Sequence, residues 1–150
     1  MGQKVTGSRK GAALVELAMI LPILLVVLFG IIEFGFILYN KAVITNSSRE
    51  GARAGIVYRV NATSGIYEPF TTTDIQAVVN TYLNGGNLLI PPSAPAITTP
   101  DGICAEFPEN PRPSLSVKVE YTYPFFVLPD LVTSITGPVT IKGESIMRCE

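Results

Sequence analysis

The sequence predicts an α+β fold, in which a long N-terminal helix is followed by a small C-terminal domain. The first 40 residues contain an apolar run long enough to cross a membrane. Farther along, two stretches alternate apolar and polar residues, at Leu115–Tyr123 and Val139–Cys149, as expected of strands that bury one face. We therefore expect these two strands to pair antiparallel beside a short helix.

The apolar residues are concentrated near the N-terminus. The chain of 150 residues is 47% hydrophobic and 15% charged, against about 25% charged in typical soluble domains. From Ala12 to Tyr39 the charged residues are Glu16 and Glu33 alone. A helix from Leu17 to Tyr39 would span roughly 35 Å, which exceeds a hydrocarbon core of about 30 Å.

These lengths divide the chain into three parts. Residues 1–11 form a basic leader, residues 12–60 a long helix with a membrane-spanning part at about 14–40, and residues 61–150 a small exported domain. Pro22 lies inside the helix and is expected to kink it or loosen one turn.

The leader is polar and basic. Lys4, Arg9 and Lys10 lie in the first eleven residues, which contain no acidic residue. These eleven residues are not an ordinary secretory signal by themselves, because they include no apolar segment. Without these three, eight basic residues would face twelve acidic ones, a net charge of about −4. This balance argues against nucleic-acid binding through charge.

A glycine and an acid mark the start of the helix. Gly11 ends the leader, and Glu16 follows five residues later at the edge of the apolar run. A carboxylate deep in a bilayer costs about 2.5 kcal/mol or more, so it is a functional candidate. Cleavage after Gly11 would create an ammonium on Ala12, one helical turn from Glu16. Glu16 could then pair with its own terminus or with that of a neighbouring subunit, or it could simply lie at headgroup level.

Two further residues are candidates for helix contacts. Glu33 lies near the outer end of the apolar run, where an interface or snorkelling role is as good an interpretation as a contact between helices in a filament. Pro22 is the other possible contact.

The N-terminal segment resembles the TadE-like family. The residues that carry the resemblance are the basic leader ending in Gly11, Glu16, Leu21-Pro22, Gly30–Gly35 and Arg49–Arg53, within about residues 9–55. TadE-like proteins are minor pilin-like subunits of the tight-adherence (Tad/Flp) pilus machinery. Leu17 stands where the short Flp pilin usually has tyrosine, and Flp pilins are much smaller, so a minor or atypical subunit is favoured.

The resemblance implies how the chain is processed and where it assembles. A prepilin peptidase would cut between Gly11 and Ala12 on the cytoplasmic side, and the mature subunit would join, prime or cap a Tad-type pilus. Its partners would be other pilin subunits, the peptidase, the pilus assembly platform and the membrane. The implied location is the bacterial inner membrane, single-pass with the domain outside, and later the extracellular pilus.

The exported domain has two cysteines. In an oxidising compartment Cys104 and Cys149 are expected to form a disulfide, worth about 4 kcal/mol on the chain-entropy model; two unpaired thiols are the alternative. We expect a short helix at Thr73–Leu83, with Thr73 and Gln76 as its capping box, and a possible third strand at Leu88–Ile90.

The sequence predicts no enzyme. It contains no histidine, and we find no nucleophile elbow, phosphate loop or Cys/His metal cluster, so no cofactor and no metal are expected. The main alternative to a pilin is a single-pass, membrane-anchored protein whose outer domain serves as a binding or adhesion module.

Overall fold

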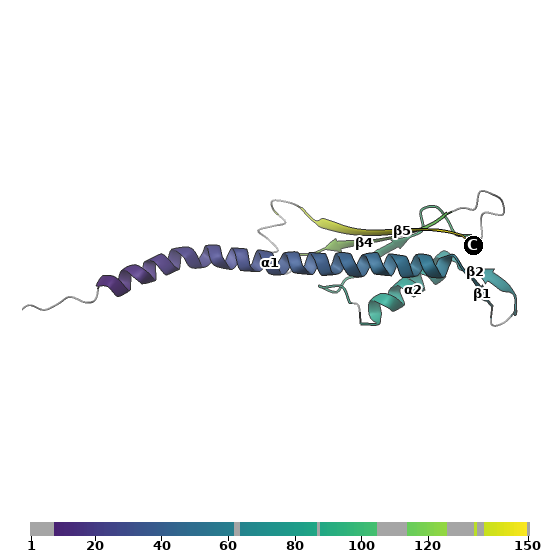
Figure 1. The fold of residues 1–150 in the computed structure, drawn as a ribbon, viewed down its shortest axis with the longest axis horizontal. Helices are drawn as coiled ribbons and strands as arrows, with labels where there is room; N and C mark the ends of the chain where they lie inside the picture. The colour runs from purple at the N-terminus through teal and green to yellow at the C-terminus, as the bar shows by residue number, and fades with distance from the viewer. Residues whose placement is uncertain are drawn as a thin grey trace, which may run out of the picture.

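The structure is a computed structural model that describes residues 8–61, 64–86, 88–104, 114–125, 134 and 137–149. A single long helix runs through the whole molecule, and a small domain packs on its C-terminal half (Figure 1). The predicted α+β class is confirmed.

The long helix α1 spans Ser8–Gly55 and has 48 residues, so it is about 72 Å long. It continues through Pro22 and curves on the N-terminal side, as expected where proline removes a backbone hydrogen bond (Figure 1). From residue 11 to 32 its side chains are exposed, apart from the half-buried Phe29. The domain covers one side of the helix from Glu33 onward.

The expectation that the helix continues to Val60 is wrong over its last residues. Gly55 lies so close to Leu115 and Ile75 that a Cβ there would stand 2.4 Å and 2.8 Å from their side chains. Directly after it the chain turns into β1, Tyr58–Val60, which pairs antiparallel with β2, Tyr67–Pro69. This short hairpin lies at the end of the domain away from the N-terminus (Figure 1).

The three-stranded sheet has the order β3-β4-β5. Strands β4, Ser114–Tyr123, and β5, Val139–Arg148, pair antiparallel along their full length, as predicted. The third strand is β3, Ala96–Thr98, which pairs with β4, so the expectation of a strand at Leu88–Ile90 is wrong. The reason is that Ile90 bonds through its backbone to an α1 side chain instead of to a strand.

The second helix, α2, spans Thr72–Asn84 and ends at Gly85, close to its predicted limits. Its capping box differs from the expected one. Thr71 accepts a hydrogen bond from the backbone N–H of Asp74, while the Asp74 side chain accepts from the backbone N–H of Thr71. Gln76, which was expected to close the box, donates to the carbonyl of Ile97 in β3.

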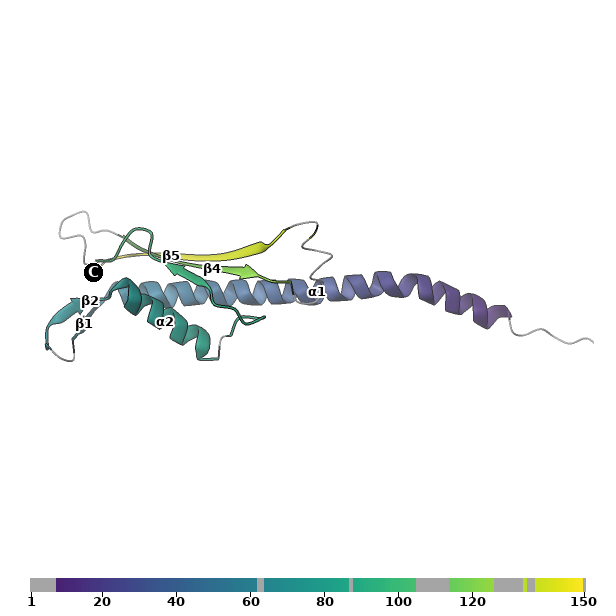
Figure 2. The ribbon, with the colours of Figure 1, turned by 180° about the vertical axis from the view of Figure 1, so that it is seen from behind.

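The core forms where α1 meets both the sheet and α2, which approach it from different sides (Figures 1 and 2). The inward side chains of β4 alternate as predicted and are fully buried: Leu115, Val117, Val119, Tyr121 and Tyr123. Glycines allow the closest approaches. A Cβ on Gly51 would lie 2.6 Å from Val79 in α2, and one on Gly143 would lie 2.8 Å from the carbonyl oxygen of Ile44.

Candidate assembly helix and its junction with the domain

The N-terminal half of α1 presents an apolar surface without any cover from the domain. We call Gly11–Ile32 the free rod; it has 22 residues and is about 33 Å long. Soluble monomers rarely expose an apolar patch of this size. By length and composition α1 can cross a membrane, and its apolar window is not buried at all. The exposed large apolar residues of the free rod are Leu14, Val15, Leu17, Met19, Ile20, Leu21, Ile23, Leu24, Leu25, Val26, Val27, Leu28, Ile31 and Ile32.

The predicted processing and register residues lie at the tip of the free rod. Gly11, Ala12 and Glu16 are all helical and exposed, and no heavy atom outside the local helix lies within 4 Å of a Cβ built on Gly11. Because Ala12 and Glu16 are four residues apart, they lie one turn apart on the same face. Residues 1–7 of the expected leader lie outside the described residues. Pro22 is exposed on the free rod and contacts no part of the domain core.

Glu33 marks the point where the domain begins to cover the helix. It is only 5% exposed, and its Oε1 accepts a 2.9 Å hydrogen bond from the phenol of Tyr123, at the end of β4. Burial, together with this bond, raises the pKa of Tyr123 above its ordinary value. The sequence indicated an interface or filament-contact role for Glu33, which stays a prediction; the structure adds a contact between Glu33 and its own domain.

Two aromatic rings pack beside Tyr123. The ring of Tyr123 packs edge-on against Tyr121 and Phe125, with centroids 6.2 Å and 5.6 Å away. Edge-to-face contacts of this kind add about 0.5–1.5 kcal/mol each beyond area burial. The junction is therefore a packed aromatic cluster with one carboxyl group at its edge.

A second polar contact holds the segment after α2 against α1. The buried side chain of Asn40 donates to the carbonyl of Ile90 at 2.5 Å and accepts from its backbone N–H at 2.9 Å. The phenol of Tyr121 donates to the neighbouring Pro91 carbonyl at 2.6 Å. The side-chain amide of Asn40 thus bonds to both the N–H and the carbonyl group of Ile90. Because its polar atoms have partners, Asn40 is tolerated in the core at 0% exposure. No sequence pattern pointed to Asn40.

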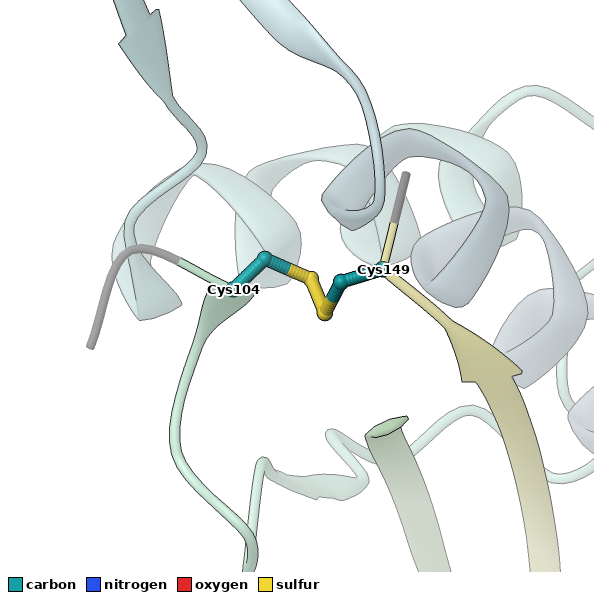
Figure 3. The surroundings of a disulfide bond; sticks show 2 residues. All are labelled: Cys104 and Cys149. Atoms are coloured by element: carbon teal, nitrogen blue, oxygen red, sulfur yellow. A yellow bond between two sulfur atoms is a disulfide. The ribbon is translucent and has the colours of Figure 1, made fainter. Parts of the chain in front are cut away.

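The disulfide is confirmed. Cys104 and Cys149 are joined, with Cα atoms 5.7 Å apart, and they stand 45 positions apart in sequence (Figure 3). On the chain-entropy model a loop of this length stabilises the fold by about 4 kcal/mol. Cys149 directly follows β5, so the bond ties the far end of the sheet to the segment after β3. In the part of the chain that the structure describes, no group of three His, Cys, Asp or Glu residues could hold a metal ion.

Comparison with known proteins agrees with the resemblance. Residues 11–53 match the family model described as TadE-like protein. This segment contains the whole free rod, with Glu16, and continues through Glu33 and Asn40 into the part of α1 that packs in the domain. No curated protein and no solved structure matches the chain. The matched segment lies entirely within α1.

Proposed function

We propose that this chain is a structural pilin-like subunit of a Tad-type pilus, either a minor pseudopilin or a pilin, which assembles through α1. The observation that carries the proposal is the free rod: an apolar helix of about 33 Å, exposed on every side, with Glu16 as its one acid. A disulfide-bonded domain lies at the other end of the same helix. Such an apolar surface is more stable against lipid or other apolar helices than against water.

The proposed mechanism begins in the membrane. A prepilin peptidase cuts the bond between Gly11 and Ala12 on the cytoplasmic side and so removes the leader. The assembly platform then extracts the subunit from the bilayer. During this step the free rod exchanges lipid for the rods of neighbouring subunits. Because both surroundings are apolar, little hydrophobic free energy opposes the exchange.

Glu16 sets the register in this scheme. Leader removal leaves an ammonium on Ala12, and an acid in an apolar surrounding is stabilised by an opposite charge nearby. An ion pair between Glu16 and the Ala12 ammonium of a neighbouring subunit would neutralise both charges. It would also fix how far one rod is displaced along the next.

We propose a shorter membrane span than the sequence suggested, residues 11–32 instead of about 14–40. Glu33 and Asn40 already lie against the domain, and the free rod alone matches a hydrocarbon core of about 30 Å. The disulfide supports an outward-facing domain, because such bonds persist in oxidising compartments. The subunit would thus be single-pass in the bacterial inner membrane before it enters the pilus.

Mass spectrometry of the N-terminus tests the proposal. The mature protein, from membranes and from purified filaments, should begin at Ala12. Gly11→Val is the informative variant, since Gly11 has open space around it and the fold should be unaffected. It should retain Met1 and be absent from filaments. A wild-type protein that keeps Met1 in the membrane fraction would remove the basis for the pilin function.

One observation favours the alternative, a permanently anchored binding module. The β1–β2 hairpin, far from the free rod, exposes Tyr58, Val60 and Tyr67, the last to 72%. Aromatic side chains at an exposed tip are typical of contact surfaces. Under this alternative the leader stays attached, and Tyr67→Ser abolishes surface binding while leaving the membrane location unchanged.

A further inference from the structure

We propose that the end of the domain nearest the free rod contacts the lipid surface and lies in the headgroup layer of the outer leaflet. We call this end the domain base and define it by the last pairs of β4 and β5, Thr122 with Thr140 and Tyr123 with Val139, together with Phe34 of α1. The inference rests on the proposed membrane anchoring through residues 11–32 and adds a second membrane contact, made by the domain itself.

The first argument is length. The free rod spans about 33 Å, and the hydrocarbon core is about 30 Å thick within about 40–45 Å of whole bilayer, so each headgroup layer is several ångströms deep. The domain begins at the next residue, because Glu33 is already bonded to Tyr123. No helical spacer therefore separates the bilayer core from the domain. One further turn of α1 rises about 5.4 Å, which is within the headgroup layer.

The second argument is the distribution of charge along the sheet. The β4–β5 pairs at the domain base are uncharged. The next outward-facing pairs are Glu120 with Lys142 and Lys118 with Glu144, and Glu120 forms ion pairs with Lys118 at 2.9 Å and Lys142 at 3.2 Å. Within the paired residues of β4 and β5, charged side chains thus begin about two residues, or about 7 Å, from the base. The exposed hydroxyl groups of Thr122 and Thr140 suit the headgroup layer, whereas the ion pairs would stand in water.

The third argument is the uncovered face of α1 beside the domain base. Phe34 is 61% exposed, Leu38 54% and Tyr39 40%, so the apolar face of the free rod continues past the point where the domain starts. Lys41 is the first basic residue after the rod, and its ammonium donates to the carbonyl of Lys142. Aromatic residues followed by lysine are typical of membrane interfaces. This exposed face of α1 is continuous with the proposed membrane-spanning segment. We therefore infer that lipid covers it.

A tryptophan scan can test this directly, because the chain contains no tryptophan. Three single variants are needed: Thr140→Trp at the domain base, Ile146→Trp farther along the same strand, and Leu24→Trp in the free rod. Thr140 and Ile146 lie on the same exposed face of β5, six residues or about 20 Å apart, so they form a matched pair. Each full-length variant is reconstituted in phosphatidylcholine vesicles without bromine, with bromine on the acyl chains near the headgroup, and with bromine near the ends of the acyl chains.

The proposal expects bromine near the headgroup to quench Thr140→Trp, and bromine near the chain ends to quench Leu24→Trp, each several-fold more strongly than Ile146→Trp. If Leu24→Trp is quenched while Thr140→Trp behaves like Ile146→Trp, the anchor stands and the domain base does not touch lipid. If Leu24→Trp is not quenched, the membrane anchoring fails, and this inference fails with it. Circular dichroism of each variant checks that the fold is kept.

Discussion

The phenol of Tyr123 donates a 2.9 Å hydrogen bond to the carboxyl group of Glu33, 90 residues earlier in the chain. This bond joins the end of β4 to the middle of α1. A buried carboxyl group is tolerated only when hydrogen-bonded, so the pair determines where on the helix the domain can begin. It therefore also sets the length of apolar helix left uncovered.

Removing the Tyr123 hydroxyl should destabilise the domain. Tyr123→Phe keeps the ring and its aromatic contacts but takes a donor from the buried carboxyl group of Glu33. We expect a loss of about 1–3 kcal/mol in the free energy of unfolding, measured by denaturant titration in detergent. Tyr121→Phe is the matched control; it removes a bond to the Pro91 carbonyl only and should lose about 1 kcal/mol or less. Equal losses of unfolding free energy in the two variants would show that the bond to Glu33 stabilises the domain no more than the bond to Pro91.

The same residues predict alkaline sensitivity. Burial raises the pKa of Tyr121, and burial with the Glu33 bond raises that of Tyr123, both above the ordinary value of 10.0. Their contribution to stability is complete below about pH 10 and is lost as pH rises further, because the unfolded chain releases these protons first. The free energy of unfolding should fall as pH rises from about 10 to about 12. The fall should be less steep in Tyr123→Phe; an identical slope would contradict the assignment.

Some elements could be predicted from sequence because their signals are local. The alternation of β4 and β5 identified both strands and their buried faces, and the composition of the free rod identified the exposed helix. The pairing of Glu33 with Tyr123 and of Asn40 with Ile90 could not be predicted. Each joins residues far apart in sequence, 90 and 50 positions, and nothing local distinguishes these polar residues from ones that face solvent.

The end of α1 shows why local signals can mislead. Residues up to Val60 are compatible with a helix, but Gly55 is needed where the helix crosses Leu115 and Ile75. The helix ends at this contact, and the chain continues into β1. Gly51 and Gly55 together allow α2 and β4 to approach α1 closely.

The start of α2 offers a test of two neighbouring threonines. Thr71→Ala removes the side chain that accepts from the N–H of Asp74 and should cost about 1 kcal/mol in the free energy of unfolding. Thr73→Ala is the matched control, since Thr73 is exposed and was the cap expected from sequence. Thermal unfolding should separate the two variants. A larger loss of stability in Thr73→Ala would instead support the capping box of Thr73 and Gln76 that the sequence predicted.

The contact between β5 and α1 depends on the absence of a side chain at Gly143. A Cβ there would stand 2.8 Å from the carbonyl oxygen and 2.9 Å from the carbonyl carbon of Ile44, and helical backbone cannot easily move aside. Gly143→Ala should therefore destabilise the domain by about 1–3 kcal/mol. Gly35→Ala on α1 meets open space and should be neutral or slightly stabilising, since alanine favours the helix. Denaturant unfolding of both variants decides, and a neutral Gly143→Ala would mean that the sheet can shift.

Glu16 gives the prediction that separates an assembly role from a passive one. Glu16→Ala should insert in the membrane and lose its leader normally, because the free rod stays apolar and Glu16 touches nothing in the domain core. It should not enter filaments, since the Ala12 ammonium would be left without its partner. Glu16→Gln keeps the size but not the charge and should fail equally, whereas Val15→Ala, also on the exposed rod, should assemble. Immunoblots of sheared filaments and of membranes measure both steps. If Glu16→Gln assembles like the wild type, a hydrogen bond is sufficient and the ion pair is not what sets the register.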